Sequence, residues 1–448
     1  MSIIIPANSA VGGGIEGNSC RFNAGSSDFL NRTFGTPTNN KKYTYSTWVK
    51  RCDSQYNVLF NAGSSRDCLR FRGDNDRLHF FTGEATSGGL QTNRIFVDPA
   101  AFYHIVLAVD TTQGTDTNRV KIYVNGVQQT SFAATNYPSQ NYTNVINSAV
   151  VHRIAHASNS YDEYFAGYMA ETVFIDGTQL APTSFGQFNG DSGVWQPIDV
   201  SGLTFGNNGF YLDFEDSSAL GNDAAGSNNW TTNNLTAIDQ TTDSPTNNFA
   251  TLNSIDNGYG TILFTEGNTR GEGSGSGWKP ARGSMGVSSG KWYWEMNMTG
   301  SNQMGVSNET IDMDNDNSQD LVGVTVFYNA SGGVIRTDGS QVGGTTATFA
   351  ADGSDIAGYA LDMDNKKLSI YKNGSIIVTN TALSTSITDF ALPFFCVNGG
   401  GTWSVNFGNP SVALSSAVAD GNGYGAFEYE PPSGYLALCT ANLSEELS

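Results

Sequence analysis

The 448-residue sequence has little charge, and positive charge is the scarcer sign. Charged residues make up 14% of the chain, and 22 Lys and Arg stand against 42 Asp and Glu, for a formal net charge of −20. Proteins that bind nucleic acid or anionic membranes neutralise phosphates with Lys and Arg. The balance therefore argues against nucleic acid and membrane as partners. It implies a neutral polar surface, which suits sugar recognition or an inert virion or extracellular surface.

The features typical of disulfide-rich, membrane-spanning and exported proteins are also scarce. The five cysteines are odd in number and form no Cys-x-x-Cys motif, which is typical of neither a disulfide scaffold nor a zinc ribbon. No apolar run approaches the roughly 18 residues of a membrane-spanning helix, and MSIIIPANSAVGGG has no basic segment before its short apolar run. We expect buried free thiols and synthesis in a reducing cytosol, with release by a route such as lysis.

Long helical periodicity is nearly absent, and strand patterns take its place. Short segments rich in β-branched and aromatic residues, bounded by Gly, Asn or Asp, recur in both halves, for example YTYSTWVKR, FYHIVLAVD, GKWYWEMNM and GTWSVNFG. The 52 glycines favour tight turns between them. The sequence predicts an all-β fold of antiparallel sandwiches, with one short helix at residues 181–188, where Thr183 or Ser184 is the expected N-cap.

The phrase Ile-Tyr-x-Asn-Gly occurs once in each half, at residues 122–126 and 370–374. Each copy follows a strand pattern and a polar turn. Asn-Gly is the strongest short hairpin signal, because a type I′ turn needs two positive φ angles. We expect equivalent hairpins in two sandwiches, with Ile122 and Ile370 in the cores and Tyr123 and Tyr371 on the opposite strand faces.

Two families share these patterns. Residues 16–217 resemble a laminin-G/pentraxin-like domain of the concanavalin A-like lectin and glucanase fold, through YTYSTWVKR, FYHIVLAVD…KIYVNG and YFAGYMAETVFIDGTQLAP. Residues 246–448 resemble a SPRY (B30.2-like) domain, through SSGKWYWEM, MGVSN, GYALDMDNKKLSIYKNG and ALPFFCVNGGGTWSVNFG. The resemblance implies two concanavalin A-like jelly rolls in tandem. An N-terminal arm is expected at 1–15, and a linker at 218–245, where apolar residues are few.

The pairing of these modules in an acidic chain rich in Gly, Asn and Thr resembles surface or fibre proteins of marine bacteriophage virions. That resemblance implies a non-enzymatic protein made in the host cytoplasm and carried on the virion surface. The expected role is that of a tail or head fibre or adhesion component that binds a host surface glycan. The alternatives are a capsid decoration protein that packs on the shell, a secreted lectin-like adhesin, and a glycan hydrolase.

The hydrolase alternative depends on paired carboxylates. YLDFEDS places Asp213 and Glu215 two residues apart, hence on one strand face about 7 Å apart. The Glu-x-Asp-x-x-Glu pattern of hydrolases with this fold is absent, and both acids also suit the wet face of a strand. His152 and His156 would lie about 13 Å apart on a strand, too far to share a zinc ion. We therefore expect no enzymatic activity.

The acidic stretch IDMDNDNSQD repeats a carboxylate at every second position, at Asp312, Asp314 and Asp316, as the opening of an EF-hand loop does. Asn317 stands where that loop needs Gly, and Gly323 stands where it needs Glu, so it is not an EF-hand. A looser calcium site and a solvated acidic loop remain as alternatives. No other cofactor is expected.

Sugar binding needs exposed aromatic rings near amide or carboxylate side chains. SPRY domains bind partners through loops at one end of the sandwich, which here include the segments around Trp278, 312–320 and 398–402. The candidate ligand-binding residues, each of which could equally be a packing residue, are Tyr137, Tyr142, Tyr161, Asp162, Trp195, Trp278, Tyr328 and Asn398.

A polar, glycine-rich arm such as NSAVGGGIEGN has little reason to be ordered alone. We expect it to contact other virion proteins and neighbouring copies, and we expect the protein to be a homo-oligomer.

Overall fold

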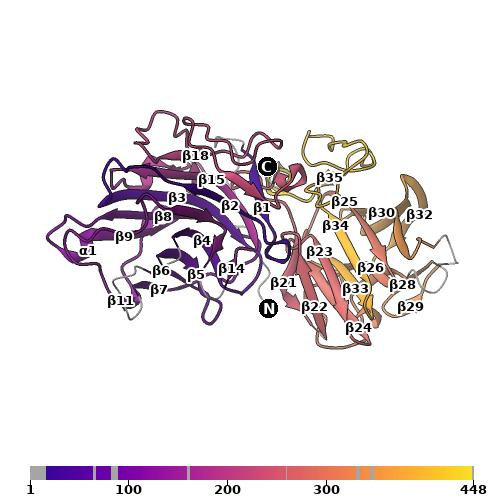
Figure 1. The fold of residues 1–448 in the computed structure, drawn as a ribbon. Coiled ribbons are helices and arrows are strands. Elements are labelled where there is room, and N and C mark those ends of the chain that lie inside the picture. Colours follow the sequence, from indigo (N-terminus) through magenta and orange to yellow (C-terminus); the bar gives the residue numbers. More distant parts are fainter. Residues whose placement is uncertain are drawn as a thin grey trace. The chain divides into compact units, whose positions relative to one another are not determined.

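The computed structural model describes residues 17–63, 67–81, 89–158, 162–258, 260–328, 333–343 and 348–445 (Figure 1). These residues form two compact units, which divide between Asn247 and Asn248. Each unit contains two large, mainly antiparallel sheets, which confirms the prediction of tandem all-β sandwiches. The five cysteines are buried thiols, as expected. No helix among the described residues is long and apolar enough to cross a membrane.

Sheets I and II build the N-terminal unit. Sheet I runs in the order β10 (Val127–Gln128), β9 (Val120–Val124), β8 (Phe102–Asp110), β3 (Lys42–Arg51), β15 (Gly167–Asp176), β1 (Ser19–Phe22) and β20 (Gln240–Thr241), with β18 (Phe210–Leu212) paired to β15. Sheet II runs in the order β11 (Phe132–Thr135), β7 (Leu90–Ile95), β6 (Arg77–Phe81), β5 (Cys68–Phe71), β4 (Asn57–Ala62), β12 (Val151–Ile154), β2 (Phe29–Thr33) and β19 (Thr231–Asn233).

Smaller elements of this unit are the pairs β13 (His156–Ala157) with β14 (Glu163–Tyr164) and β16 (Gly186–Phe188) with β17 (Trp195–Pro197), the helix α1 (Asp116–Arg119), and 3₁₀ turns at Ala24–Ser26, Pro182–Ser184 and Ala237–Asp239. The helix predicted at 181–188 is therefore wrong. The chain makes one 3₁₀ turn with Pro182 at its start and then enters β16, because β17 supplies a strand for it to pair with.

The stretch 218–245 is not a linker, as the sequence suggested, but part of the N-terminal unit. It contributes β19 to sheet II and β20 to sheet I, and Trp230 is buried in the core between the sheets. Asp243 pairs with Lys50 at 2.8 Å, and neither side chain has exposed surface. Few apolar residues suffice here, because the polar ones pair with strands and buried groups.

Sheets III and IV build the C-terminal unit. Sheet III runs in the order β21 (Leu252–Asn257), β24 (Trp278–Gly283), β33 (Leu392–Asn398), β26 (Ser301–Ser307), β27 (Val324–Tyr328), β28 (Val334–Thr337) and β29 (Ser340–Gln341). Sheet IV runs in the order β22 (Thr261–Thr265), β23 (Arg270–Ser274), β34 (Thr402–Asn406), β25 (Lys291–Thr299), β30 (Asp352–Asp362), β31 (Lys367–Lys372) and β32 (Ser375–Ala382), with β35 (Leu436–Ala437) beside β25. A 3₁₀ turn at Ser318–Asp320 and the helix α2 (Thr440–Glu445) complete it.

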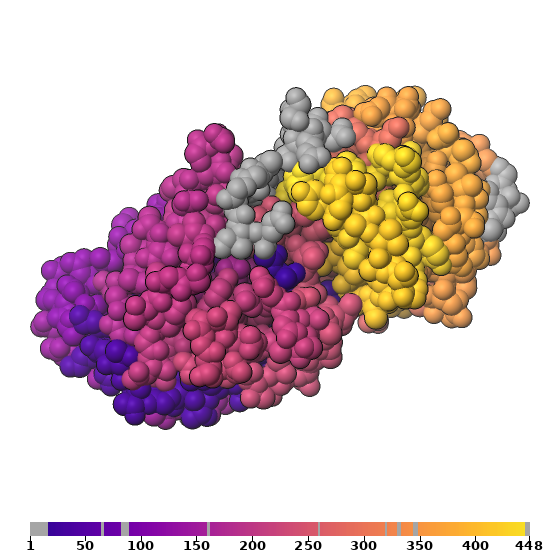
Figure 2. All heavy atoms as spheres, turned by 90° about the horizontal axis from the view of Figure 1, so that it is seen from above, coloured from indigo at the N-terminus to yellow at the C-terminus, as the bar shows by residue number. Residues whose placement is uncertain are grey.

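Irregular segments cover the outer faces of these sheets. The loop between β26 and β27 lies on sheet III, where Ile311 and Met313 are buried against Val324 and Phe394. The segment after β34 lies on sheet IV, where Phe427 packs edge-on against Tyr293 of β25. In the space-filling view this C-terminal segment forms a broad surface patch, yellow in Figure 2.

Both Asn-Gly phrases form the expected turns. Asn125 and Gly126 have φ angles of 49° and 78°, and Asn373 and Gly374 have 48° and 75°. Both pairs therefore have the positive φ angles of a type I′ hairpin. The turns join β9 to β10 and β31 to β32, which pair antiparallel next to each turn.

The two asparagines also make the same contacts. The Asn125 side chain accepts a hydrogen bond from the His104 N–H, and the Asn125 N–H donates to the His104 carbonyl. Asn373 forms the same reciprocal pair with Ile356 of β30. Each hairpin is thus hydrogen-bonded to the strand that precedes it. The two hairpins therefore resemble each other in structure as well as in the five-residue phrase.

We predict that Asp243→Ala destabilises the N-terminal unit by about 3–5 kcal/mol, because it removes the carboxylate that pairs with the buried Lys50 ammonium. Urea unfolding of the full chain measures the change. Asp191→Ala is the matched control, since that carboxylate lies in an exposed turn, and it should change the free energy of unfolding by less than about 0.5 kcal/mol. Equal effects of the two substitutions would contradict the assignment of 218–247 to this unit.

Candidate functional site

The outer face of sheet III brings together three of the predicted ligand-binding residues. Trp278 of β24 is paired with Asn398 of β33, and the rings of Trp278 and Tyr328 meet edge to face with centroids 5.6 Å apart. Trp278 and Tyr328 are half-buried, and Asn398 is exposed. Three strands thus place two aromatic rings and an amide on one face, as sugar recognition requires.

Gln303 of β26 lies on the same face, and the sequence analysis missed it. The register places it between Cys396 of β33 and Tyr328 of β27. Its side chain is 1% exposed, and its Oε1 has no hydrogen-bond partner within the described part of the chain. An unsatisfied buried amide oxygen costs free energy, so this position suits a ligand or water that donates a hydrogen bond.

Arg336 of β28 completes this group, which we name the Trp278 face: Trp278, Gln303, Tyr328, Arg336 and Asn398. The Arg336 guanidinium lies 5.4 Å from the centre of the Tyr328 ring and pairs with Asp320 at 2.6 Å. Because Asp320 neutralises its charge, the face offers rings, amides and a paired guanidinium. Its chemistry fits a neutral ligand with many hydroxyl groups better than an anion.

The other candidates do not join this face. Tyr137 is half-buried and packs against the core of the N-terminal unit, and Tyr142 is also half-buried. Tyr161 lies outside the described residues. Asp162 is exposed and accepts a hydrogen bond from His156 at 2.8 Å.

Trp195, the remaining candidate, is only 5% exposed, and its indole N–H donates to His104 Nδ1 at 2.9 Å. Because Nδ1 accepts, the ring proton is on Nε2, which donates to Ser46 Oγ at 2.8 Å. A serine nucleophile would need the opposite arrangement, with the imidazole accepting its proton. Burial also lowers the pKa of His104 to about 3. The contact between Ser46 and His104 is therefore structural.

The acidic loop on sheet III alternates between buried apolar residues and exposed acids. Ile311 and Met313 face the sheet and are buried, while Asp312 and Asp314, which follow them in turn, are exposed. Asp312 Oδ1 accepts the Asp314 N–H at 3.0 Å. Within the described residues, no three His, Cys, Asp or Glu side chains are arranged to hold a metal ion, so Asp312, Asp314 and Asp316 are not brought together as a calcium site.

Asp213 and Glu215 do not share a strand face, contrary to the sequence prediction. Strand β18 ends at Leu212, Phe214 has a φ of 57°, and the Glu215 N–H turns back to Asp213 Oδ1 at 3.2 Å. The chain therefore turns at this point instead of continuing as a strand.

Glu171 is a buried carboxyl group that interacts electrostatically with Asp213 and Glu215 of this turn. It lies at an irregularity of β15, where the register with β3 shifts, and it accepts the Tyr211 hydroxyl at 2.6 Å. Burial raises the pKa of Glu171 to about 7, and the negative charges of Asp213, Glu215 and Asp199 add to the rise. No sequence pattern marked this residue, because its environment depends on the strand irregularity.

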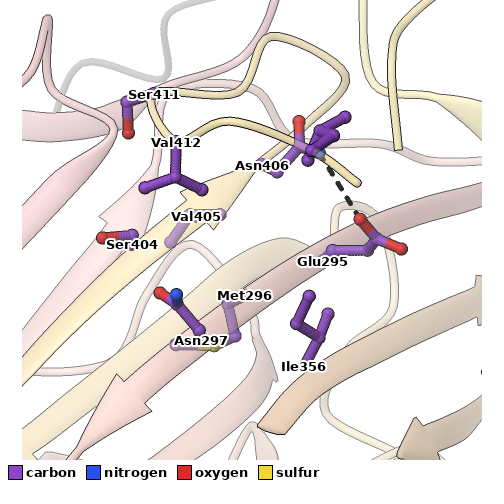
Figure 3. Close-up of a pocket in the computed structure, with 10 residues that line it drawn as sticks. Glu295, Met296, Asn297, Ile356, Ser404, Val405, Asn406, Ser411 and Val412 are labelled. Carbon is purple, nitrogen blue, oxygen red and sulfur yellow. Dashed lines mark hydrogen bonds between the residues drawn. The ribbon is translucent and has the colours of Figure 1, made fainter. Parts of the chain in front are cut away.

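A small pocket opens on the outer face of sheet IV, where the segment after β34 crosses the strands (Figure 3). Asn297 and Ser404 lie on the strands, and Ser411 and Val412 lie on the crossing segment. The full lining is Glu295, Met296, Asn297, Ile356, Ser404, Val405, Asn406, Ser411, Val412 and Leu414.

Glu295 is committed to holding that segment. Its carboxylate accepts the N–H groups of Glu428 and Tyr429, both at 2.8 Å, and the Tyr293 hydroxyl at 3.1 Å. The Asn406 amide lies 3.5 Å away, the dashed contact in Figure 3. Burial raises the pKa of Glu295 although these hydrogen bonds oppose the rise. Donors of the protein itself therefore occupy the Glu295 oxygens. The pocket thus has a role in packing the covering segment on the sheet.

One comparison with known protein families matches part of the N-terminal unit. A family model described as "Concanavalin A-like lectin/glucanases superfamily" (Laminin_G_3) matches residues 24–180. The expected laminin-G, concanavalin A-like domain is confirmed there. No curated protein matches the chain.

Three solved structures are also similar to parts of the chain. Stonustoxin is 18% identical over 35% of this chain and 27% of its own, with a TM-score of 0.30. The SPRY domain of human HERC1 is 21% identical over 32% of this chain and 91% of its own, with a TM-score of 0.27. The TRIM65 PSpry domain is 14% identical over 35% of this chain and 91% of its own, with a TM-score of 0.29. The chain thus spans about a quarter of the length of stonustoxin.

We predict that Glu171→Gln stabilises the protein at pH 8 and not at pH 5. The folded pKa of about 7 lies above the ordinary value of 4.5, so this group's contribution is present below pH 4.5 and is lost as pH rises through 7. Gln keeps an acceptor for Tyr211 and has no proton to lose. Its advantage at pH 8 should reach about 2–3 kcal/mol.

Urea unfolding at the two pH values measures this change. Glu215→Gln is the control, because that side chain is exposed, and it should show no such gain. The same difference between Glu171→Gln and the unmodified protein at both pH values would contradict the prediction.

Proposed function

We propose that this protein is a non-enzymatic binding protein on the surface of a bacteriophage particle, where it acts as a fibre or adhesion component and recognises a host surface glycan. The observation that carries the glycan part is the Trp278 face. There two rings, an exposed amide and the buried Gln303 oxygen, which has no hydrogen-bond partner among the described residues, share one sheet surface. Aromatic rings pack on the C–H face of a sugar, and amides bond its hydroxyl groups.

The rest of the chain supports binding over catalysis. The N-terminal unit has a concanavalin A-like domain, a fold shared by lectins and glucanases. Asp213 and Glu215 are separated by a turn, and the buried histidine beside Ser46 holds its proton on the wrong nitrogen for a general base. The Glu295 carboxylate at the sheet IV pocket already accepts hydrogen bonds from two N–H groups of the covering segment.

The particle location is supported by composition and by the sequence resemblance to virion proteins. A net charge of −20 disfavours nucleic acid and anionic membranes as partners, and neutral polar residues predominate on such a surface. We propose that the arm at residues 1–15, which lies outside the described residues, attaches the protein to other virion proteins and to copies of itself within the assembled particle.

We predict that Trp278→Ala and Asn398→Ala each weaken retention of the bound glycan at least tenfold, about 1.4 kcal/mol, on a glycan array probed with the purified full chain. Trp278→Phe should retain part of the affinity, because a ring remains. Asn297→Ala is the matched control, since this amide lies in the sheet IV pocket. A Trp278→Ala variant that unfolds normally and binds as well as the unmodified protein would remove the Trp278 face from the proposal.

Two further outcomes separate this function from its rivals. Absence of glycan binding together with tight binding to purified shell protein would favour a decoration role. Release of reducing ends from a host polysaccharide, abolished by Asp213→Asn or by Glu171→Gln, would show that the protein is a hydrolase.

We predict that removing residues 1–15 leaves glycan binding unchanged and abolishes incorporation into particles. Quantitative immunoblotting of purified particles, produced with either chain, measures incorporation. Particles that carry equal amounts of both chains would place the attachment elsewhere in the protein.

A further inference from the structure

The edges of the four large sheets differ in how well they are protected. A strand at a sheet edge exposes N–H and C=O groups that another strand can pair with, and proteins blunt such edges by shortening or distorting them. Among the described residues, four of the eight edge strands, β10, β19, β20 and β29, have only two or three residues. Three more, β11, β21 and β32, have shifts in their pairing register.

Strand β22 is the exception. Its five residues, Thr261–Thr265, pair with β23 in one unbroken register. The strand, TILFT, contains no charge, Pro or Gly, and Leu263 at its centre is 59% exposed. Ile262 and Phe264 turn to the other side and pack against the core. A flat, regular, apolar edge of this kind is a template for strand addition.

We propose that β22 pairs antiparallel with β22 of a second copy of this chain. A two-fold axis at Leu263 places the two exposed Leu263 side chains opposite each other. On the same face, Thr261 of each copy meets Thr265 of the other. On the core face, Ile262 meets Phe264. Every pair matches β-branched or apolar groups, and none juxtaposes like charges.

The absence of charge on β22 favours this contact, because the net charge of −20 makes copies of the chain repel one another elsewhere on their surfaces. The strand is uncharged, and the charged residues of the next strand, Arg270 and Glu272, compensate each other at 3.7 Å. The edge is therefore a place where two acidic molecules can approach without bringing carboxylates together. The resulting dimer has a closed, isologous interface and joins sheet IV of both copies into one sheet.

The dimer is a property separate from the proposed glycan recognition, but it would increase the apparent affinity for a glycan. Two linked copies present two Trp278 faces, so a polymer with repeated sugar units can engage both. The second contact is then intramolecular, which raises the apparent affinity without any new residue.

A disulfide across the two-fold axis tests the register. Facing residues of an antiparallel pair have Cα atoms about 4.5–5.5 Å apart, which suits a disulfide. Leu263→Cys should form a covalent dimer under mild oxidation, seen on a non-reducing gel and reversed by reductant. The five native cysteines are buried and give little background. Thr265→Cys is the matched control, because its two copies lie about 13 Å apart along the strands, and it should stay uncrosslinked.

Light scattering tests the contact in unmodified strands. The full chain should have the mass of a dimer, and Leu263→Lys should halve that mass, because two ammonium groups then face each other. Val322→Lys is the control, since Val322 is 64% exposed and lies just before β27 of sheet III, whereas β22 belongs to sheet IV; it should leave the dimer intact.

Three results would overturn the proposal. The first is an unmodified chain that is monomeric at every concentration. The second is equal crosslinking of Leu263→Cys and Thr265→Cys, which would indicate random collision. The third is a dimer that survives Leu263→Lys and is lost when residues 1–15 are removed, which would assign the contact to the N-terminal arm.

Discussion

Buried carboxylates that accept backbone N–H groups hold this structure together, because long irregular segments lie on the sheets and need partners for their backbones. Asp176, at the end of β15, accepts the N–H groups of Thr38, Asn39 and Asn208. In the C-terminal unit Glu295 binds the N–H groups of 428 and 429, and Asp420 binds those of 422, 424 and 437. A charge-assisted hydrogen bond to a backbone N–H is stronger than a neutral one, so a few acids can fix segments that have few apolar residues. The excess of Asp and Glu is in part a structural feature of the interior.

This arrangement determines which surfaces remain for recognition. On sheet IV the segment held by Glu295 covers the central strands, and on sheet III the loop with Ile311 and Met313 covers the side near Val324. Trp278 packs on the margin of the covered cluster and is half-buried, and its cross-strand neighbour Asn398 is exposed. The proposed glycan contact is therefore located where the covering ends. Its rings are held rigidly by neighbouring strands, which lowers the entropy that a ligand must overcome.

The sequence predicted well what depends on local patterns. Asn-Gly turns, strand alternation and the two-unit plan follow from backbone sterics and from hydrophobic period, and they are confirmed. The sequence predictions are less reliable where the structure depends on contacts between residues that are distant in the sequence. The stretch 218–245 looks like a linker until Trp230 is seen in the core and Asp243 beside Lys50. The alternating acids Asp312 and Asp314 suit a calcium site or a solvated loop by sequence alone, and the structure relates the alternation to the burial of Ile311 and Met313. Of the candidate site residues, Trp278, Tyr328 and Asn398 converge because cross-strand register aligns them, and Gln303 joins them by register alone, which no local pattern encodes.

The shared hairpin shows where the two units differ. In both, an asparagine at the start of a type I′ turn binds the strand before it in the same reciprocal way, through His104 in one unit and Ile356 in the other. Beside that common frame, His104 is buried under Trp195, whereas Ile356 lines an open pocket. The same backbone contact therefore lies beneath a packed aromatic ring in one unit and beside a small pocket in the other. The difference lies in the covering segments, whose course is set by buried acids. Specific recognition in this chain thus depends less on the sandwiches than on the segments that lie across them and on the surfaces those segments leave free.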